Sequence, residues 1–287
     1  MIKQTVKFVL IGLVLPTVSV LNAQTDSQWF TANELYANVW QISDHGADNI
    51  YLVEGRDSSL LIDTGLGAAD LASYIRKLTS KPLIVLNTHG HSDHAGSNYQ
   101  FEKVYMHSAD TLAARQCNSP EAREGSSKTM LQGNIPSEKE LFRGRPIHTK
   151  LIPVPDGYVF NLGNRRMQVI EAPGHTPGEI CILDVENKLL FSGDNDNTLV
   201  WLFLQNSKPL HEYLITLEKL AGRLSEFNTI LPGHGGPLPS DFILDQVKCV
   251  KGILDKSLES KPYKSFAGNS MISTFGRASV AFNPDNL

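Results

Sequence analysis

The sequence predicts an α/β fold made of two similar halves that pack sheet against sheet, with helices on the outside. Short apolar runs typical of buried strands alternate with stretches of helical spacing, and this alternation occurs twice along the chain. The halves cover residues of about 28–117 and about 151–260, and a long connection at 118–150 joins them. With 287 residues, of which 41% are hydrophobic and 20% charged, the chain is long enough for a large core.

The N-terminus resembles a secretory signal peptide, residues 1–23. Lys3 and Lys7 supply positive charge, residues 8–20 are largely apolar, and Ala23 offers a small residue at a cleavage point. We therefore expect an exported protein, periplasmic or secreted, whose mature chain, 24–287, forms a single domain. An uncleaved membrane anchor is the alternative, although the apolar run is short for a membrane span.

The first half begins with short strands rich in Ile, Leu and Val, separated by turn residues such as Gly46 and Gly55. A stretch with apolar side chains at Leu71, Ile75 and Leu78 has helical spacing. The elements expected here are strands at 40–42, 50–53 and 60–62, a helix at 70–78, strands at 83–86 and 104–106, and a helix at 109–115.

The second half repeats the pattern, and its clearest helix has leucines and a tyrosine along one side. Residues from Lys261 onward have few periodic apolar positions and give no clear prediction. The elements expected in this half are strands at 167–170, 180–185 and 188–191, a helix at 210–224, a strand at 229–231 and a helix at 242–258.

The connection at 118–150 has no clear periodicity and contains three prolines and three glycines. A connection of this length without its own structure is often a lid or a binding loop. We expect it to be partly helical and to contribute to substrate selectivity.

The chain has three cysteines, Cys117, Cys181 and Cys249. Because the count is odd, at least one of them is free or pairs with another chain. One disulfide is compatible with an oxidising compartment, and the sequence does not say which pair would form it. Cys181 lies in an apolar, strand-like run and is expected to be a buried thiol.

The side chains best suited to chemistry gather in one short segment. His89, His91, Asp93 and His94 place three imidazoles and a carboxylate within six residues, directly after the strand expected at 83–86. Loops that leave the carboxyl ends of strands are where α/β sheets usually hold their sites. Neutral imidazole and carboxylate are ligands that zinc and iron accept, so this segment predicts metal binding.

Three later residues occur in a similar setting. His175, Asp194 and His234 each follow a strand-like run and lie in a turn rich in Gly or Pro. Taken alone, each is also compatible with an ordinary turn residue, and Asp196 competes with Asp194. Together with the His-rich segment, they form an ordered set of candidate ligands.

This ordered set resembles the metallo-β-lactamase-fold hydrolases. The segment 89–94 is similar to the family's H-x-H-x-D-H signature, and Asp63 lies in a strand-end Asp-x-Gly element like the one that precedes it in the family. The resemblance runs from about residue 38 to about residue 236 and implies a four-layer αβ/βα sandwich with the site at one edge. It also implies a first metal bound by His89, His91 and His175, a second bound by Asp93, His94 and His234, and Asp194 as a bridge between them.

Four further residues are candidates for supporting roles. Asp63 is expected to orient the His-rich loop rather than to bind metal. His45 lies in a turn between two expected strands, and Asn197 and Trp201 follow Asp194 in the sequence. These three are candidates for the rim of the substrate site.

The resemblance implies an exported dinuclear zinc hydrolase in which metal-bound hydroxide attacks a small ester, lactone, thioester or lactam, with Asp93 taking part in catalysis. Iron and manganese are compatible with the same ligands. One alternative is a metallo-β-lactamase proper, similar to the third subclass of that family, although Asp194 favours the other branches. A second alternative is an exported metal-binding protein without catalysis.

The expected partner is a small-molecule substrate. The formal net charge is −4 and the chain has no basic run, which makes nucleic acid a poor partner. After removal of the signal peptide we expect no association with a membrane. The sequence does not predict the oligomeric state.

Overall fold

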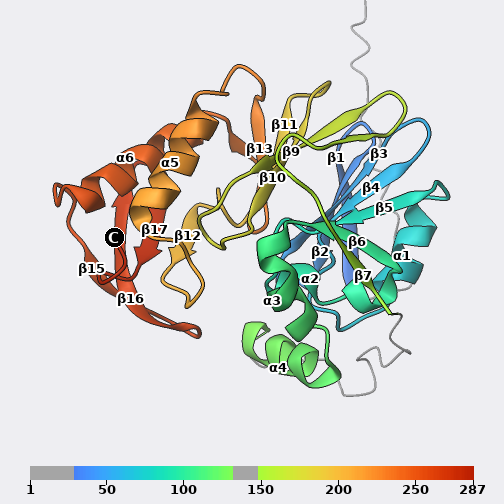
Figure 1. Cartoon of the computed structure of the whole chain (residues 1–287), viewed down its shortest axis with the longest axis horizontal. Helices are drawn as coiled ribbons and strands as arrows, with labels where there is room; N and C mark the ends of the chain where they lie inside the picture. The colour runs from blue at the N-terminus through green and yellow to red at the C-terminus, as the bar shows by residue number, and fades with distance from the viewer. Residues whose placement is uncertain (1–28, 132–147) are drawn as a thin grey trace, which may run out of the picture.

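The computed structural model describes residues 29–131 and 148–287, in which two β-sheets face each other with helices on their outer sides (Figure 1). The predicted signal peptide, 1–23, lies outside the described residues, as does the middle of the predicted connection, 132–147. Within the described residues, none of the helices has the length and hydropathy of a membrane span.

The first sheet has seven strands that follow one another in chain order. The first four form an antiparallel meander, and the last four run parallel to one another. Its strands are β1 (Phe30–Tyr36), β2 (Val39–Asp44), β3 (Asn49–Glu54), β4 (Ser59–Ile62), β5 (Leu83–Leu86), β6 (Lys103–Met106) and β7 (Lys150–Pro153).

The second sheet has six strands in the order β14-β13-β11-β10-β9-β8. Of its neighbouring strands, only β11 and β13 pair in parallel. Its strands are β8 (Val159–Asn161), β9 (Arg166–Glu171), β10 (Ile180–Asp184), β11 (Leu189–Gly193), β13 (Thr229–Pro232) and β14 (Leu238–Pro239).

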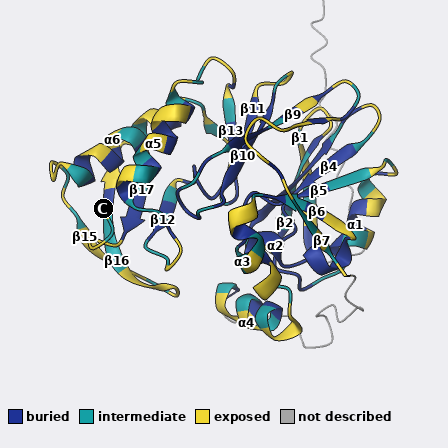
Figure 2. Cartoon of the chain, viewed as in Figure 1, coloured by how far each residue is buried: buried dark blue, intermediate teal, exposed yellow. Residues whose placement is uncertain are grey.

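The main core lies between these two sheets, where apolar side chains of both inner faces interlock. Tyr51 and Phe191, for example, meet edge to face with ring centroids 5.2 Å apart. Figure 2 shows the central strands buried and the outer helices exposed on one side. The helices are α1 (Leu71–Leu78), α2 (Ser92–Ala95), α3 (Thr111–Gln116), α4 (Pro120–Met130), α5 (Leu210–Ala221) and α6 (Phe242–Leu254), with short 3-10 turns η1 (Asn98–Gln100) and η2 (Ser108–Asp110).

The outer faces are covered as the amphipathic patterns predict. Leu71 and Ile75 of α1 pack on the first sheet, and Tyr213 and Leu217 of α5, together with α6, pack on the second. The order helix, sheet, sheet, helix is the four-layer αβ/βα sandwich that the sequence predicts (Figure 1).

A third sheet extends the second half and was not predicted. It contains β12 (Leu199–Leu202), β15 (Lys261–Ser265), β16 (Gly268–Phe275) and β17 (Ala278–Phe282), in the order β12-β17-β16-β15. Val280 and Phe282 of β17 belong to the same apolar cluster as α5 and α6. The tail from Lys261, which has no clear pattern in the sequence, therefore contributes β17 to the folded core.

The expected strands and helices all occur, with differences at their ends. The helix expected at 242–258 ends at Leu254, where the chain turns through Lys256 with a left-handed φ of 62°. The connection at 118–150 contains α4, which agrees with the expectation of partial helix. All three cysteines are free and buried, so the disulfide considered for them is not formed.

Candidate metal centre

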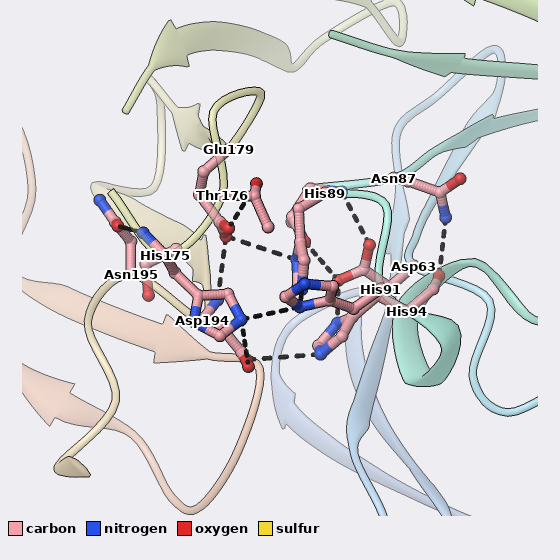
Figure 3. A network of polar contacts seen from close by, with 12 residues as sticks. Asp63, Asn87, His89, His91, His94, His175, Thr176, Glu179, Asp194 and Asn195 are labelled. Carbon is pink, nitrogen blue, oxygen red and sulfur yellow. Dashed lines mark hydrogen bonds and ion pairs between the residues drawn. The ribbon is translucent and has the colours of Figure 1, made fainter. Parts of the chain in front are cut away.

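The predicted ligands from the two halves meet at one edge of the facing sheets (Figure 3). The loop after β5 and the short helix α2 supply the ligands of the first half. The turns after β9, β11 and β13 supply those of the second half. The residues brought together are His89, His91, Asp93, His94, His175, Asp194 and His234.

Three imidazoles form a first group. Nδ1 of His91 lies 3.2 Å from Nε2 of His89 and 2.9 Å from Nε2 of His175. The rings are nearly perpendicular to one another, so their nitrogen lone pairs converge on one point rather than stacking. This is the arrangement of three ligands on one face of a metal ion.

A carboxylate and two imidazoles form a second group. Oδ2 of Asp93 lies 3.6 Å from Nε2 of His94 and 3.4 Å from Nε2 of His234. His94 is fully buried, whereas His234 is partly exposed at the mouth of a cavity. Each group therefore has one partly exposed residue, His91 in the first and His234 in the second.

Asp194 lies between the groups and presents one oxygen to each. Its Oδ2 is 3.4 Å from Nε2 of His175, in the first group. Its Oδ1 is 3.4 Å from Nε2 of His94 and 3.3 Å from Nε2 of His234, in the second. A carboxylate in this position is able to bridge two ions.

The donor set fits metal ions in its spacing and in its burial. Ligands about 2.0–2.1 Å from a tetrahedral ion lie roughly 3.3–3.4 Å apart, close to the separations around Asp194. Nε2 of His94 and Oδ1 of Asp194 are buried without a hydrogen-bond partner among the described residues. Buried polar atoms normally have such a partner, and a cation would satisfy both.

The surroundings keep the first group neutral. Burial lowers the pKa of His91 to about 4 and lowers the pKa values of His89 and His175. Imidazole binds a metal only in its neutral form, so these three nitrogens are ready as ligands at neutral pH.

The second group is charged in the protein alone. Burial acts to lower the pKa values of His94 and His234, but the carboxylates of Asp93 and Asp194 outweigh it and raise both well above the usual value. Burial acts to raise the pKa of Asp93, and the two imidazoles nevertheless lower it to about 2. A cation bound here would replace the protons of these two histidines.

Asp63 lies directly behind the second group, as expected for an orienting residue. Its Oδ2 is 2.9 Å from Nδ1 of His94 and accepts a hydrogen bond from the Thr88 hydroxyl at 2.8 Å, and its Oδ1 accepts one from the Thr88 amide. These contacts fix the His94 ring so that Nε2 points toward Asp93 and Asp194.

Two buried carboxylates hold the site together and were not predicted. Oε1 of Glu179 accepts a hydrogen bond from the Asp194 amide at 3.0 Å and lies 3.5 Å from Nδ1 of His89. Asp110 accepts hydrogen bonds from the Gly90 amide and the Thr176 hydroxyl, and so connects the two loops that carry the first group. An acidic residue directly before the apolar strand β10 was a usable signal for Glu179. Asp110 has no comparable signal in the sequence.

A cavity of about 850 Å³ opens above these residues, a volume typical of small-molecule sites. Asn197 and Trp201, two of the predicted rim residues, line it. His45 instead stacks on Trp29, with ring centroids 4.6 Å apart, while its neighbours Gly46 and Ala47 line the cavity.

The fold and this site define a metal-dependent hydrolase of the metallo-beta-lactamase superfamily. The chain belongs to that superfamily, whose sequence profile matches residues 44–236. It is similar to the human acyl-coenzyme A thioesterase MBLAC2, with 32% identity over 231 residues that cover 72% of this chain and 81% of the relative. The alternative of a non-catalytic metal-binding protein is therefore not retained.

Two solved structures share the fold. A metallo-beta-lactamase from Pontibacter korlensis matches with a TM-score of 0.56 at 18% identity, over 77% of this chain and 99% of the other. The protein TTHA1623, solved in a di-iron-bound form, matches with a TM-score of 0.50 at 27% identity, over 68% of this chain and 91% of the other.

The comparisons contradict the prediction of export. The animal relatives, from human and from cattle, are named for acyl-coenzyme A, and thioesters of coenzyme A are metabolites of the cell interior rather than of the periplasm or the medium. The prediction rested on residues 1–23, which lie outside the described residues. The prediction that the enzyme is exported, periplasmic or secreted is therefore wrong and is not retained.

Proposed function

We propose that this protein hydrolyses acyl thioesters at a centre of two metal ions, with zinc as the first expectation and iron or manganese as alternatives. The position of Asp194 carries the dinuclear assignment, because each of its carboxylate oxygens faces a different group of ligands. The di-iron form of TTHA1623 supports two ions in a related site. The proposed ligands are His89, His91 and His175 for one ion, Asp93, His94 and His234 for the other, and Asp194 for both.

The thioester assignment rests on the thioesterase relatives and on the chemistry of the leaving group. A thiol has a pKa near 8.5, so a thiolate leaves a tetrahedral intermediate without a strong general acid. A site built mainly from imidazole and carboxylate ligands therefore suits a thioester better than it suits an ester with an alkoxide leaving group.

Metal ions held by these residues would supply a nucleophilic water at neutral pH by lowering its pKa. Asp93 lines the cavity, and its low pKa keeps it ionised. Its Oδ2 faces His94 and His234, which leaves Oδ1 to accept a proton from the attacking water. The water oxygen adds to the carbonyl carbon, the carbon–sulfur bond breaks, and the sulfur takes up the proton that Asp93 accepted. The products are a thiol and a carboxylic acid, which releases its remaining proton to solvent at neutral pH.

The test is thiol release from acyl-coenzyme A, followed with a thiol-reactive dye, by protein stripped of metal and then reloaded with zinc, iron or manganese. We expect turnover only in the reloaded protein, with about two equivalents of metal bound. Asp93→Asn should lower kcat by about 100-fold or more while leaving the fold intact.

Nitrocefin serves as the comparison substrate for the β-lactamase alternative. Faster turnover of nitrocefin than of any acyl thioester would replace the thioesterase assignment with a lactamase one. A stoichiometry of one metal ion in a fully active protein would refute the dinuclear centre.

A further inference from the structure

The cavity above the candidate metal centre is bounded on one side by α4 and on the other by the third sheet. The third sheet contributes Trp201 of β12 and Phe266 at the turn between β15 and β16. That hairpin follows the residues matched by the superfamily, 44–236. Figure 1 shows its tip reaching toward α4. This chain therefore closes its cavity with an element outside the shared core of the superfamily.

The third sheet and the turns that leave its strands carry an aromatic wall, defined here as Trp201, Phe203, Tyr263 and Phe266. Trp201 and Phe266 line the cavity, and the other two rings lie beside them. The Trp201 ring packs on Phe203 with centroids 5.2 Å apart and on Phe266 at 5.3 Å, and Tyr263 lies 6.5 Å from it. Phe266 is nevertheless 50% exposed. A half-exposed aromatic ring beside a cavity offers apolar surface to a ligand.

The aromatic wall starts at the metal centre itself. The backbone carbonyl of Trp201 accepts a hydrogen bond from Nδ1 of His175 at 2.8 Å, so the residue that fixes one candidate ligand also lines the cavity with its ring. A substrate whose carbonyl lies at the centre therefore has the aromatic wall immediately beside one of its arms.

The facing wall, on α4, is made of mostly small side chains. At Gly125 a Cβ atom would meet no other atom within 4 Å, so the space in front of this position is open. A larger residue here would project into the cavity without displacing the protein around it. The cavity-lining residues of α4 are Ala122, Gly125, Ser126, Thr129 and Met130.

We propose, on the basis of the thioesterase function above, that the acyl chain of the substrate lies between the aromatic wall and α4, and that Gly125 and Phe266 set the chain length. A thioester has two arms, and only the acyl arm is hydrocarbon. The thiol arm of coenzyme A begins with amides, which are costly to bury against apolar walls without partners. The walls therefore select medium or long acyl chains over acetyl groups.

The test compares kcat/KM of the metal-loaded protein for acetyl-, butanoyl-, octanoyl- and dodecanoyl-coenzyme A. Each methylene buried between the walls should raise kcat/KM by about threefold to fourfold until the cavity is filled. Gly125→Leu fills the open space, and Phe266→Ala removes the outer ring. Both should lower the dodecanoyl-to-acetyl ratio of kcat/KM by tenfold or more.

The matched control is Glu121→Leu, which adds the same side chain to an exposed position of α4 that does not line the cavity. It should keep the wild-type ratio. Calorimetric titration of metal-loaded wild-type and Gly125→Leu protein with dodecanoate, the expected product, measures the same subsite without turnover. Dodecanoate should bind the variant at least tenfold more weakly.

The outcomes separate the two proposals. A chain-length series that is flat in the wild type, or unchanged by Gly125→Leu and Phe266→Ala, overturns the acyl subsite while the thioesterase function stands. Failure of the wild type to hydrolyse any member of the series overturns both. The acyl subsite is supported if kcat/KM of the wild type rises with acyl chain length, and if Gly125→Leu and Phe266→Ala, but not Glu121→Leu, remove this rise.

Discussion

Asp63 shows how one residue behind a ligand can control metal binding. Its φ of 66° is left-handed, and asparagine tolerates that backbone about as well as aspartate. Asp63→Asn should therefore keep the fold but remove the negative charge that holds Nδ1 of His94. We expect metal affinity to fall by roughly 10- to 100-fold, measured by competition with a chelator of known affinity. Asp57→Asn, at an exposed aspartate, is the control and should change nothing.

Asp196 predicts a pH-dependent stability. Burial raises its pKa from 3.8 to about 7, and neither of its carboxylate oxygens has a hydrogen-bond partner among the described residues. Between these values the folded chain holds a proton that the unfolded chain releases, so the free energy of unfolding falls as pH rises from about 4 to about 7.

Asp196→Asn removes this titration. The stability of the variant relative to wild type should therefore rise across the same pH window, by about 4 kcal/mol in total, and stay constant above it. Urea unfolding at intervals from pH 4 to pH 8 measures the difference. A difference that does not vary with pH would show that Asp196 is not buried as a neutral acid.

For single residues of the candidate site, the sequence predicted those whose role shows in a short segment of the chain. It missed those whose contacts lie far away in the sequence. His89, His91, Asp93 and His94 could be proposed as ligands because all four lie within six residues, soon after a strand. Asp110 could not, because its hydrogen-bond partners Thr176 and Gly178 lie 66 and 68 residues away. A residue that connects two loops has no pattern of its own in the chain.

Among the elements, the third sheet was the least predictable. Its strand β12 pairs in parallel with β17, Leu199 opposite Ser279, so the partner is distant in sequence. The hairpin β15–β16 is mostly exposed or half-buried and lacks the apolar alternation of a core strand. The strands β3, β4, β10 and β11 were easier because both of their faces are buried. The strands β1, β7, β8 and β14 of the same sheets are more exposed, and the sequence did not predict them.

The third sheet should nevertheless contribute to stability through β17. Phe282 is almost fully buried against α5 and α6, so Phe282→Ala should lower the free energy of unfolding by about 3–5 kcal/mol. Phe266→Ala, at the exposed end of the same sheet, should change it by less than about 0.5 kcal/mol. Denaturant unfolding of both variants compares the two. Equal effects would contradict this division of roles within the sheet.

At the scale of the molecule, we propose that the described residues form one cooperative domain. The core between the two sheets takes side chains from both halves, and each half also supplies ligands to the candidate metal centre. Neither half can lose its structure without exposing the inner face of the other.

Metal removal should therefore lower the stability of the whole chain. An ion present at about 1,000 times its dissociation constant stabilises the folded state by about 4 kcal/mol. For a chain of this size, loss of that stabilisation lowers Tm by on the order of 10 °C. Calorimetry with and without a chelator should show one transition that shifts as a unit. Two transitions, of which only one shifts, would mean that the halves unfold separately.

The place of the hairpin β15–β16 in the chain has a consequence for biosynthesis. Every candidate ligand, from His89 to His234, precedes Lys261, the first residue of the hairpin. A chain growing on the ribosome therefore completes its candidate metal ligands before it has made Tyr263 and Phe266, the part of the aromatic wall that the hairpin supplies. A metal ion can therefore bind while the hairpin side of the cavity is still open. The hairpin β15–β16 folds later and covers a metal centre that is already formed.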